Sequence, residues 1–196
     1  MNASTSLARG KVERTRFHSE VLANDRDVWV YTPPGYKPGS ARLPLLVTFD
    51  GPLFLDWMQI PTILDNLIAQ RRVPPMVAVL VDAASGKRDS ELACDQAFAE
   101  FLAKELVPWM RKEHDATPDP ALNVVAGSSR GGLAAACAGY QHPEVFGNVL
   151  SQSGSYWWSP PEEAERSWLT RQFAFFPSIK RNSLATRVTE GYAGKA

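Results

Sequence analysis

One hexapeptide restricts the fold of this chain more than any other feature. Residues 127–132 (GSSRGG) follow a short apolar run, residues 122–126, and precede the small side chains of residues 133–140. The apolar run predicts a buried strand and the small residues predict a helix. The glycines permit a backbone turn so tight that a side chain would clash there. The sequence therefore predicts a strand, a sharp turn and a helix, with Ser129 at the turn.

Strand-like and helix-like segments alternate along the rest of the chain. Strands are predicted over residues 12–22, 27–31, 43–49, 76–81, 122–126 and 145–152, and helices over residues 60–70, 90–111 and 133–140. This alternation predicts an α/β fold, a mostly parallel sheet covered by helices on both faces. A length of 196 residues with 44% hydrophobic residues suits a single domain over residues 1–196.

Charge and hydropathy exclude several classes of protein. Lys and Arg number 21 against 21 Asp and Glu, so no basic excess points to nucleic acid or to an anionic membrane surface. Residues 1–11 hold no apolar run of the length of a secretory signal, and no stretch approaches the about 20 apolar residues of a membrane span. We expect a soluble, cytoplasmic protein with no nucleic-acid or membrane partner.

The two cysteines predict neither a metal site nor a disulfide framework. Cys94 and Cys137 lie far apart in the sequence and form no Cys-x-x-Cys pair. We expect both to be small buried hydrophobic residues.

The turn at Ser129 has the pattern of a catalytic nucleophile. Residues 127–131 match G-x-S-x-G between a predicted strand and a predicted helix, the context that a nucleophile elbow requires. Such a turn exposes Ser129 at the carboxyl edge of the sheet and aims the N–H of Arg130, at the helix start, toward a developing oxyanion. The alternative is a glycine-rich turn whose serine only caps the helix.

A second oxyanion donor is predicted in the loop after residues 43–49. Asp50-Gly51-Pro52 follows that strand, where hydrolases of this type supply the other N–H. Pro52 has no N–H, so the donor is Gly51 or Leu53. The alternative is an ordinary Asp-Gly-Pro turn.

No histidine is placed to act as the base for Ser129. His142 lies 13 residues further on, at the far end of the predicted helix, roughly 20 Å away at 1.5 Å per residue. His114 ends the helix before the Ser129 strand and so belongs at the opposite edge of the sheet, and His18 lies on an N-terminal strand.

Several segments together resemble the enterochelin (enterobactin) esterase family, in the esterase-D-like branch of the α/β-hydrolases. The similar segments are residues 149–158 (VLSQSGSYWW), 88–92 (RDSEL), 49–51 (FDG), 74–75 (PP) and 143–147 (PEVFG), in the family's order and spacing. The resemblance runs from about Trp29 to Trp158, some two thirds of the chain.

The resemblance implies a cytoplasmic serine esterase without a cofactor or a metal site of its own. It would hydrolyse the triserine trilactone of a catecholate siderophore, or of its ferric complex, so that iron is released in the cell. Ser129 would be the nucleophile. Arg88 would pair with the anionic catecholate, although pairing with Glu91 is an alternative. Trp157 and Trp158 would wall the pocket, or else belong to the core.

The chain also departs from the family. The family's Gly-Gly-His-Asp type of segment, which carries the catalytic histidine, is absent, and the chain ends at Ala196 before the last strand and helix of the fold are expected. We therefore expect an α/β-hydrolase domain whose C-terminal part is missing. The alternative function is a truncated, catalytically impaired esterase remnant, or a binding protein, that lacks the catalytic histidine.

Overall fold

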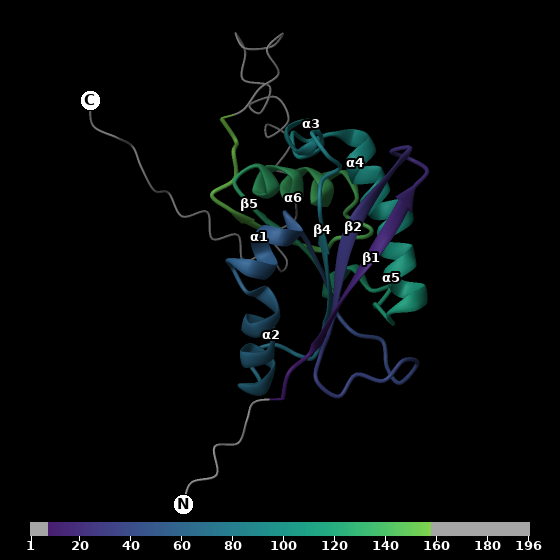
Figure 1. The fold of residues 1–196 in the computed structure, drawn as a ribbon, viewed down its shortest axis with the longest axis vertical. Helices are drawn as coiled ribbons and strands as arrows, with labels where there is room; N and C mark the ends of the chain where they lie inside the picture. The colour runs from purple at the N-terminus through teal and green to yellow at the C-terminus, as the bar shows by residue number, and fades with distance from the viewer. Residues whose placement is uncertain (1–7, 158–196) are drawn as a thin grey trace, which may run out of the picture. The chain divides into compact units, whose positions relative to one another are not determined.

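A six-stranded sheet organises the part of the chain that the structure, a computed structural model, describes, residues 8–157 (Figure 1). The strands are β1 (Lys11–Ser19), β2 (Asn24–Thr32), β3 (Leu45–Phe49), β4 (Val77–Val81), β5 (Asn123–Ser128) and β6 (Asn148–Gln152). Their order is β1-β2-β4-β3-β5-β6. The pairs β1–β2 and β2–β4 are antiparallel, whereas β4, β3, β5 and β6 run parallel. The mostly parallel sheet is confirmed.

Helices cover both faces of this sheet, as predicted. They are α1 (Gly51–Asp56), α2 (Ile60–Ala69), α3 (Arg88–Glu91), α4 (Gln96–Phe101), a π-helical turn η1 (Leu102–Leu106), α5 (Val107–Glu113), a 3-10 turn η2 (Pro120–Leu122) and α6 (Arg130–Gln141). Successive side chains of a strand point to opposite faces. In β4, Val79 packs into the large core beneath α4, α5 and α6, whereas its neighbour Ala78 packs with Leu64 of α2.

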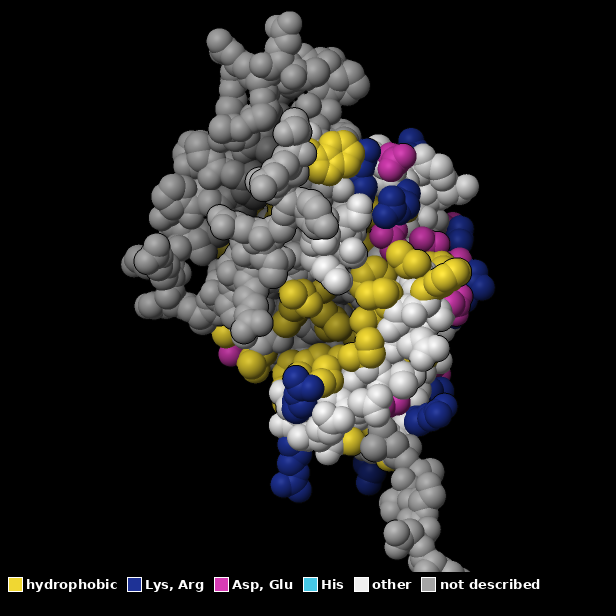
Figure 2. Space-filling model, turned by 90° about the vertical axis from the view of Figure 1, so that its left-hand side faces the viewer, with side chains coloured by type: hydrophobic (Ala, Val, Ile, Leu, Met, Phe, Trp, Pro, Cys, Tyr) yellow, Lys and Arg dark blue, Asp and Glu magenta, His cyan; other side chains and the backbone are white. Residues whose placement is uncertain are grey.

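The side of the molecule that carries α1 and α2 is partly apolar at its surface. Figure 2 looks at this side and shows hydrophobic side chains gathered there. On α1, α2 and the link between them, the large exposed hydrophobic residues are Leu53, Trp57, Met58 and Ile63. Trp57 is the most exposed of them, at 84%.

The single long helix predicted over residues 90–111 is wrong. The chain leaves α3 at Glu91, and Cys94 has a left-handed φ of 64° that an α-helix does not allow. Asp95 then caps a new helix, since its side chain accepts a hydrogen bond from the N–H of Phe98 at 2.7 Å. The sequence signal for this break is the Asp95 cap, which lies within the apolar periodicity of the helix.

The strand predicted over residues 145–152 begins at Asn148 instead. The N–H groups of Val145 and Phe146 both donate to the carbonyl of His142, which makes a tight turn at the end of α6. Both side chains are nevertheless buried, and this explains why an apolar run at these positions predicts a strand.

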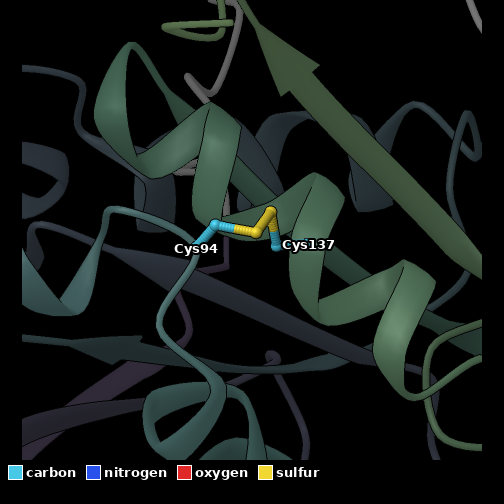
Figure 3. Close-up of a disulfide and its surroundings, with 2 residues drawn as sticks. All are labelled: Cys94 and Cys137. Carbon is cyan, nitrogen blue, oxygen red and sulfur yellow. A yellow bond between two sulfur atoms is a disulfide. The ribbon is translucent and has the colours of Figure 1, made fainter. Parts of the chain in front are cut away.

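The cysteine prediction is also wrong, because Cys94 and Cys137 form a disulfide (Figure 3). The bond joins the segment after α3 to the middle of α6, across 43 residues of sequence and a Cα–Cα distance of 5.4 Å. Sequence spacing does not reveal this pairing, because it arises from α6 packing beside the α3–α4 connection. Cys137 is buried as expected, and Cys94 is half-buried.

No helix within residues 8–157 combines the length and the apolar character needed to cross a membrane. The expectation of one domain over residues 1–196, with its C-terminal part missing, stays a prediction.

Candidate active site

Ser129 stands at a strained and exposed turn between β5 and α6. Its backbone angles are φ 56° and ψ −118°, outside the regions that side chains ordinarily adopt. A Cβ added to Gly127 would lie 2.3 Å from the backbone of Gly131, so only glycine allows the strand to approach the helix this closely. The side chain of Ser129 is exposed. The predicted strand, turn and helix are therefore present, with the serine accessible at the carboxyl end of β5.

Backbone hydrogen bonds on both sides hold this strained turn. The N–H of Ser129 donates to the carbonyl of Gln152 at 3.0 Å, and the carbonyl of Ser129 accepts from the N–H of Ser155 at 2.9 Å. Both partners lie at or just beyond the end of β6. The serine side chain makes no capping hydrogen bond to its helix, so the alternative of a serine that only caps α6 is not what the structure shows.

Two helices begin at neighbouring strand ends beside Ser129. Strands β3 and β5 pair in parallel, and α1 and α6 start directly after them. The first N–H groups of a helix have no acceptor within it, and these include the N–H of Arg130 in α6 and the N–H of Gly51 in α1. Gly51 is buried, and an added Cβ would lie 2.4 Å from the Trp29 ring, which explains the glycine there. The roles of Arg130 and Gly51 as oxyanion donors stay predictions.

Arg88 reaches this end of the sheet through Asp50, the residue that follows β3. Its guanidinium donates to both carboxylate oxygens of Asp50, at 2.6 and 2.8 Å, and this hydrogen-bonded pair raises the pKa of Arg88. Asp50 in turn lies against the first turn of α6, since a Cβ on Gly131 would be 3.6 Å from its Oδ2. Arg88 is thus placed near the elbow, with 45% of its side chain exposed.

The alternative partner for Arg88, Glu91, is wrong. Glu91 is buried and forms a two-pronged ion pair with Arg26 of β2, at 2.9 and 3.0 Å. The partner that sequence reasoning missed is Asp50. Its place at the carboxyl end of a parallel strand next to β5 was the available signal, because such strand ends share one edge of the sheet.

A second carboxyl group, Asp82, follows β4 at the same edge of the sheet. Burial is the main cause that raises the pKa of Asp82, and the negative charges of Asp50 and Asp27 raise it further. The N–H of Ala83 donates to Asp82 and opposes this shift. The carboxyl edge of the sheet thus combines the exposed hydroxyl of Ser129 with acidic and arginine side chains, among them Asp50, Asp82 and Arg88.

Of the two tryptophans predicted to wall the pocket, the structure describes one. Trp157 is 80% exposed, which excludes the alternative that it belongs to the core. It follows Ser155 by two residues, so it stands on the segment that contacts Ser129. Trp158 lies outside the described residues. Their roles in substrate binding stay predictions.

None of the three histidines of the chain hydrogen-bonds to Ser129 in the structure. The ring of His18, on β1, is paired with Asp25, and the ring of His142 is paired with Glu144 at the far end of α6. His114 ends α5 and packs edge-on against Trp109, and burial lowers its pKa. Each histidine lies on the element expected from the sequence, His18 on an N-terminal strand and His114 and His142 at helix ends.

Within residues 8–157 no three His, Cys, Asp or Glu side chains are grouped so that they could hold a metal ion.

Comparison with known proteins assigns the chain to a family. The family model Esterase, described as “Putative esterase”, matches residues 19–188. The chain belongs to this esterase family. The matched range includes the elbow, the Asp50 loop and Arg88.

Individual relatives agree with the family model. The Iron(III) enterobactin esterases of Dickeya dadantii and Escherichia coli K12 are each 40% identical to this chain over 141 residues, 71% of it. The enterobactin esterase of Shigella flexneri, crystallised with 2,3-dihydroxy-N-benzoyl-serine, superimposes with a TM-score of 0.76 at 34% identity over 89% of this chain. The resemblance drawn from the motifs, and the α/β-hydrolase fold that it implied, are confirmed.

The match covers only part of each relative. This esterase-family chain spans 32% and 35% of the length of the two curated relatives, and 45% of the Shigella flexneri structure.

Proposed function

We propose that this chain is a serine esterase in which Ser129 is the nucleophile. The observation that carries the proposal is the strained, exposed Ser129 turn at the start of α6, in a chain of an esterase family. A serine held in this way meets its substrate at a helix N-terminus, where N–H groups favour developing negative charge. Loss of Ser129 should therefore lower turnover at least about tenfold.

The proposed reaction passes through an acyl-enzyme. The Oγ of Ser129 attacks the ester carbonyl, a base takes its proton, and the N–H groups of Arg130 and Gly51 stabilise the oxyanion. The alcohol leaves with a proton, and water then releases the acid and restores the serine. The base is none of the three histidines, since their rings face other partners. We therefore expect slow turnover by this chain alone.

The proposed substrate is an ester of a catecholate siderophore of the enterobactin type, or its ferric complex, so that hydrolysis serves iron acquisition. Support comes from the names of the relatives and from a Shigella flexneri structure determined in the presence of enterobactin. Arg88 supplies a partly exposed cation for the anionic catecholate, and Trp157 and Trp158 supply faces for its rings. No cofactor is part of this proposal.

The decisive experiment compares the wild-type chain with Ser129→Ala on a p-nitrophenyl ester and on enterobactin with and without Fe(III). We expect wild-type release at least about tenfold above the variant. Ser153→Ala, in an exposed position nearby, is the matched control and should behave as wild type. Equal rates for wild type and Ser129→Ala would overturn the esterase proposal and favour a binding protein or an impaired remnant.

Arg88 is tested separately, through a difference between substrates. Arg88→Lys keeps the charge but loses the two-pronged geometry toward anions. We expect a higher KM for ferric enterobactin and an unchanged KM for the neutral p-nitrophenyl ester. Equal changes for both substrates would contradict a binding role.

We also propose a cytoplasmic location, which the family resemblance implies. Disulfides are rare in the reducing cytosol, so the Cys94–Cys137 bond makes this proposal testable. Cells lysed directly into an alkylating reagent should yield both cysteines alkylated if the protein is cytoplasmic. An intact disulfide would place the protein in an oxidising compartment.

A further inference from the structure

A side chain in hydrogen-bond range of the nucleophile belongs to another serine. The Oγ of Ser129 and the Oγ of Ser155 are 3.3 Å apart. The two hydroxyls differ in their surroundings, because Ser129 is exposed whereas Ser155 is only 2% exposed. A buried hydroxyl keeps a hydrogen-bond partner because leaving it unpaired is costly, and here that partner is the nucleophile.

Ser155 is held rigidly relative to the elbow by backbone contacts. Its N–H donates to the carbonyl of Ser129, and the carbonyl of Gln152 accepts from the N–H of Ser129. Two glycines bring the segments together, since a Cβ on Gly132 would lie 3.0 Å from the Cα of Gly154. The hydroxyl of Ser155 therefore stands on a fixed support and does not depend on a flexible side chain to find Ser129.

A neutral hydroxyl is a poor base, so Ser155 does not replace a histidine. It can instead select one of the three staggered positions of the Ser129 Oγ, which is otherwise free to rotate at an exposed site. A nucleophile held in one rotamer spends more of its time in the geometry of attack. The separation of 3.3 Å is long for a hydroxyl pair, so the effect on rate should be modest.

We propose that Ser155 is a positioning residue for the nucleophile, which holds the Ser129 Oγ through its own hydroxyl. The proposal rests on the proposed role of Ser129. Because Ser155 acts on the position of Ser129 and not on substrate binding, it should change the rate of covalent reaction and leave the affinity for the reagent unaltered.

The test uses a fluorophosphonate, which phosphonylates a reactive serine and releases fluoride, followed by intact-mass measurement. The rate constant kinact and the half-saturation KI are measured for the wild type and for Ser155→Ala, which keeps the backbone N–H bond and removes only the hydroxyl. We expect kinact to fall about 3- to 10-fold with KI unchanged, the range that loss of one neutral hydrogen bond allows. Ser153→Ala, in the same loop, should leave both constants at the wild-type values.

A second variant separates the hydrogen bond from packing. Ser155→Cys fills nearly the same space but bonds weakly, so its kinact should resemble that of the alanine variant. It also decides the matter if Ser155→Ala fails to fold in a thermal melt. Wild-type kinact in both variants, or in the cysteine variant when only that one folds, would overturn the positioning role.

The same experiment separates this proposal from the proposed function. If the wild type is not labelled, or is labelled equally after Ser129→Ala, the nucleophile itself is refuted and the role of Ser155 falls with it. If Ser129 is labelled and the Ser155 variants that fold react at the wild-type rate, only the role of Ser155 is refuted.

Discussion

Replacing Glu91 with alanine should destabilise this protein more than removing any exposed charge. The side chain of Arg26 is completely buried and that of Glu91 is 7% exposed, and two hydrogen bonds of 2.9 and 3.0 Å join them. The Arg26 guanidinium also lies over the ring of Phe101, 4.6 Å from its centre. Glu91→Ala would leave this buried cation without its hydrogen-bonded counter-charge, with the carbonyl of Asp82 and the side chain of Asn24 as its other hydrogen-bond acceptors.

The expected cost follows from that geometry. Breaking one side of a buried ion pair costs about 3–5 kcal/mol, which for a domain of this size corresponds to a fall of about 6–20 °C in the melting temperature. Replacing both members, Arg26→Met with Glu91→Leu, should recover most of the loss, because apolar residues of similar volume often match a buried pair. The Asn24 side chain, which accepts from Arg26 at 2.8 Å, would still lose its partner.

Urea denaturation of the single and double variants measures these differences. Lys104→Ala is the control, since Lys104 pairs with Glu100 on an exposed helix face and should cost no more than about 0.5 kcal/mol. A loss below about 1 kcal/mol for Glu91→Ala would refute the reasoning. So would a double variant that is as unstable as the sum of the two single ones.

Three further predictions concern the elbow, the disulfide and the response to acid. Gly127→Ala would place a Cβ 2.3 Å from the first turn of α6, so we expect the free energy of unfolding to fall by roughly 1–3 kcal/mol or more and fluorophosphonate labelling to be slower. Labelling at the wild-type rate would contradict the elbow geometry. Replacing both Cys94 and Cys137 with serine opens a loop closed across 43 residues, and chain entropy predicts that the free energy of unfolding falls by about 4 kcal/mol. The reduced wild type should melt like this variant, and a variant that melts like the oxidised wild type would refute a stabilising role of the disulfide. Hydrogen bonds from the N–H of Gly39 and then from the Tyr36 hydroxyl lower the pKa of Asp115, so its carboxylate contributes stability above the unfolded pKa of about 3.9, and this stability is lost as the pH falls through the lower folded value. Asp115→Asn should therefore flatten the fall of the urea midpoint below about pH 4, and an unchanged slope would show that Asp115 does not contribute to the acid response.

The sheet and the elbow were predictable because their signals are local. Continuous apolar runs such as Val77–Val81 indicate strands buried on both faces. The turn at residues 127–132 (GSSRGG) can be recognised from its glycines, because the close approach of the backbone at Gly127 excludes every other residue there. The sequence patterns of these features lie within short stretches of the chain, so they can be recognised without knowing which distant segments pair.

The contacts that sequence reasoning missed join distant segments. Arg88 pairs with Asp50, 38 residues away, and Glu91 pairs with Arg26, 65 residues away. Within a short helix such as α3 the local pairing of Arg88 with Glu91 is the obvious choice, but burial at the sheet gives each a better partner. The Cys94–Cys137 bond was not predicted for the same reason, since it joins the α3–α4 connection to a helix residue 43 positions away.

The hydrogen bonds that join Ser129, the proposed nucleophile, to Gln152 and Ser155 tie the formation of its turn to the addition of β6 during folding. Ser129 is separated from Gln152 and Ser155 by 23 to 26 residues, so β5 and α6 alone cannot hold its unfavourable backbone angles. A chain that has formed the central strands but has not yet added β6 would relax this turn. Reactivity of Ser129 toward a serine-directed probe should therefore develop late in refolding, after helix content has returned. The labelled fraction would then measure how many molecules are native and how many are still compact intermediates.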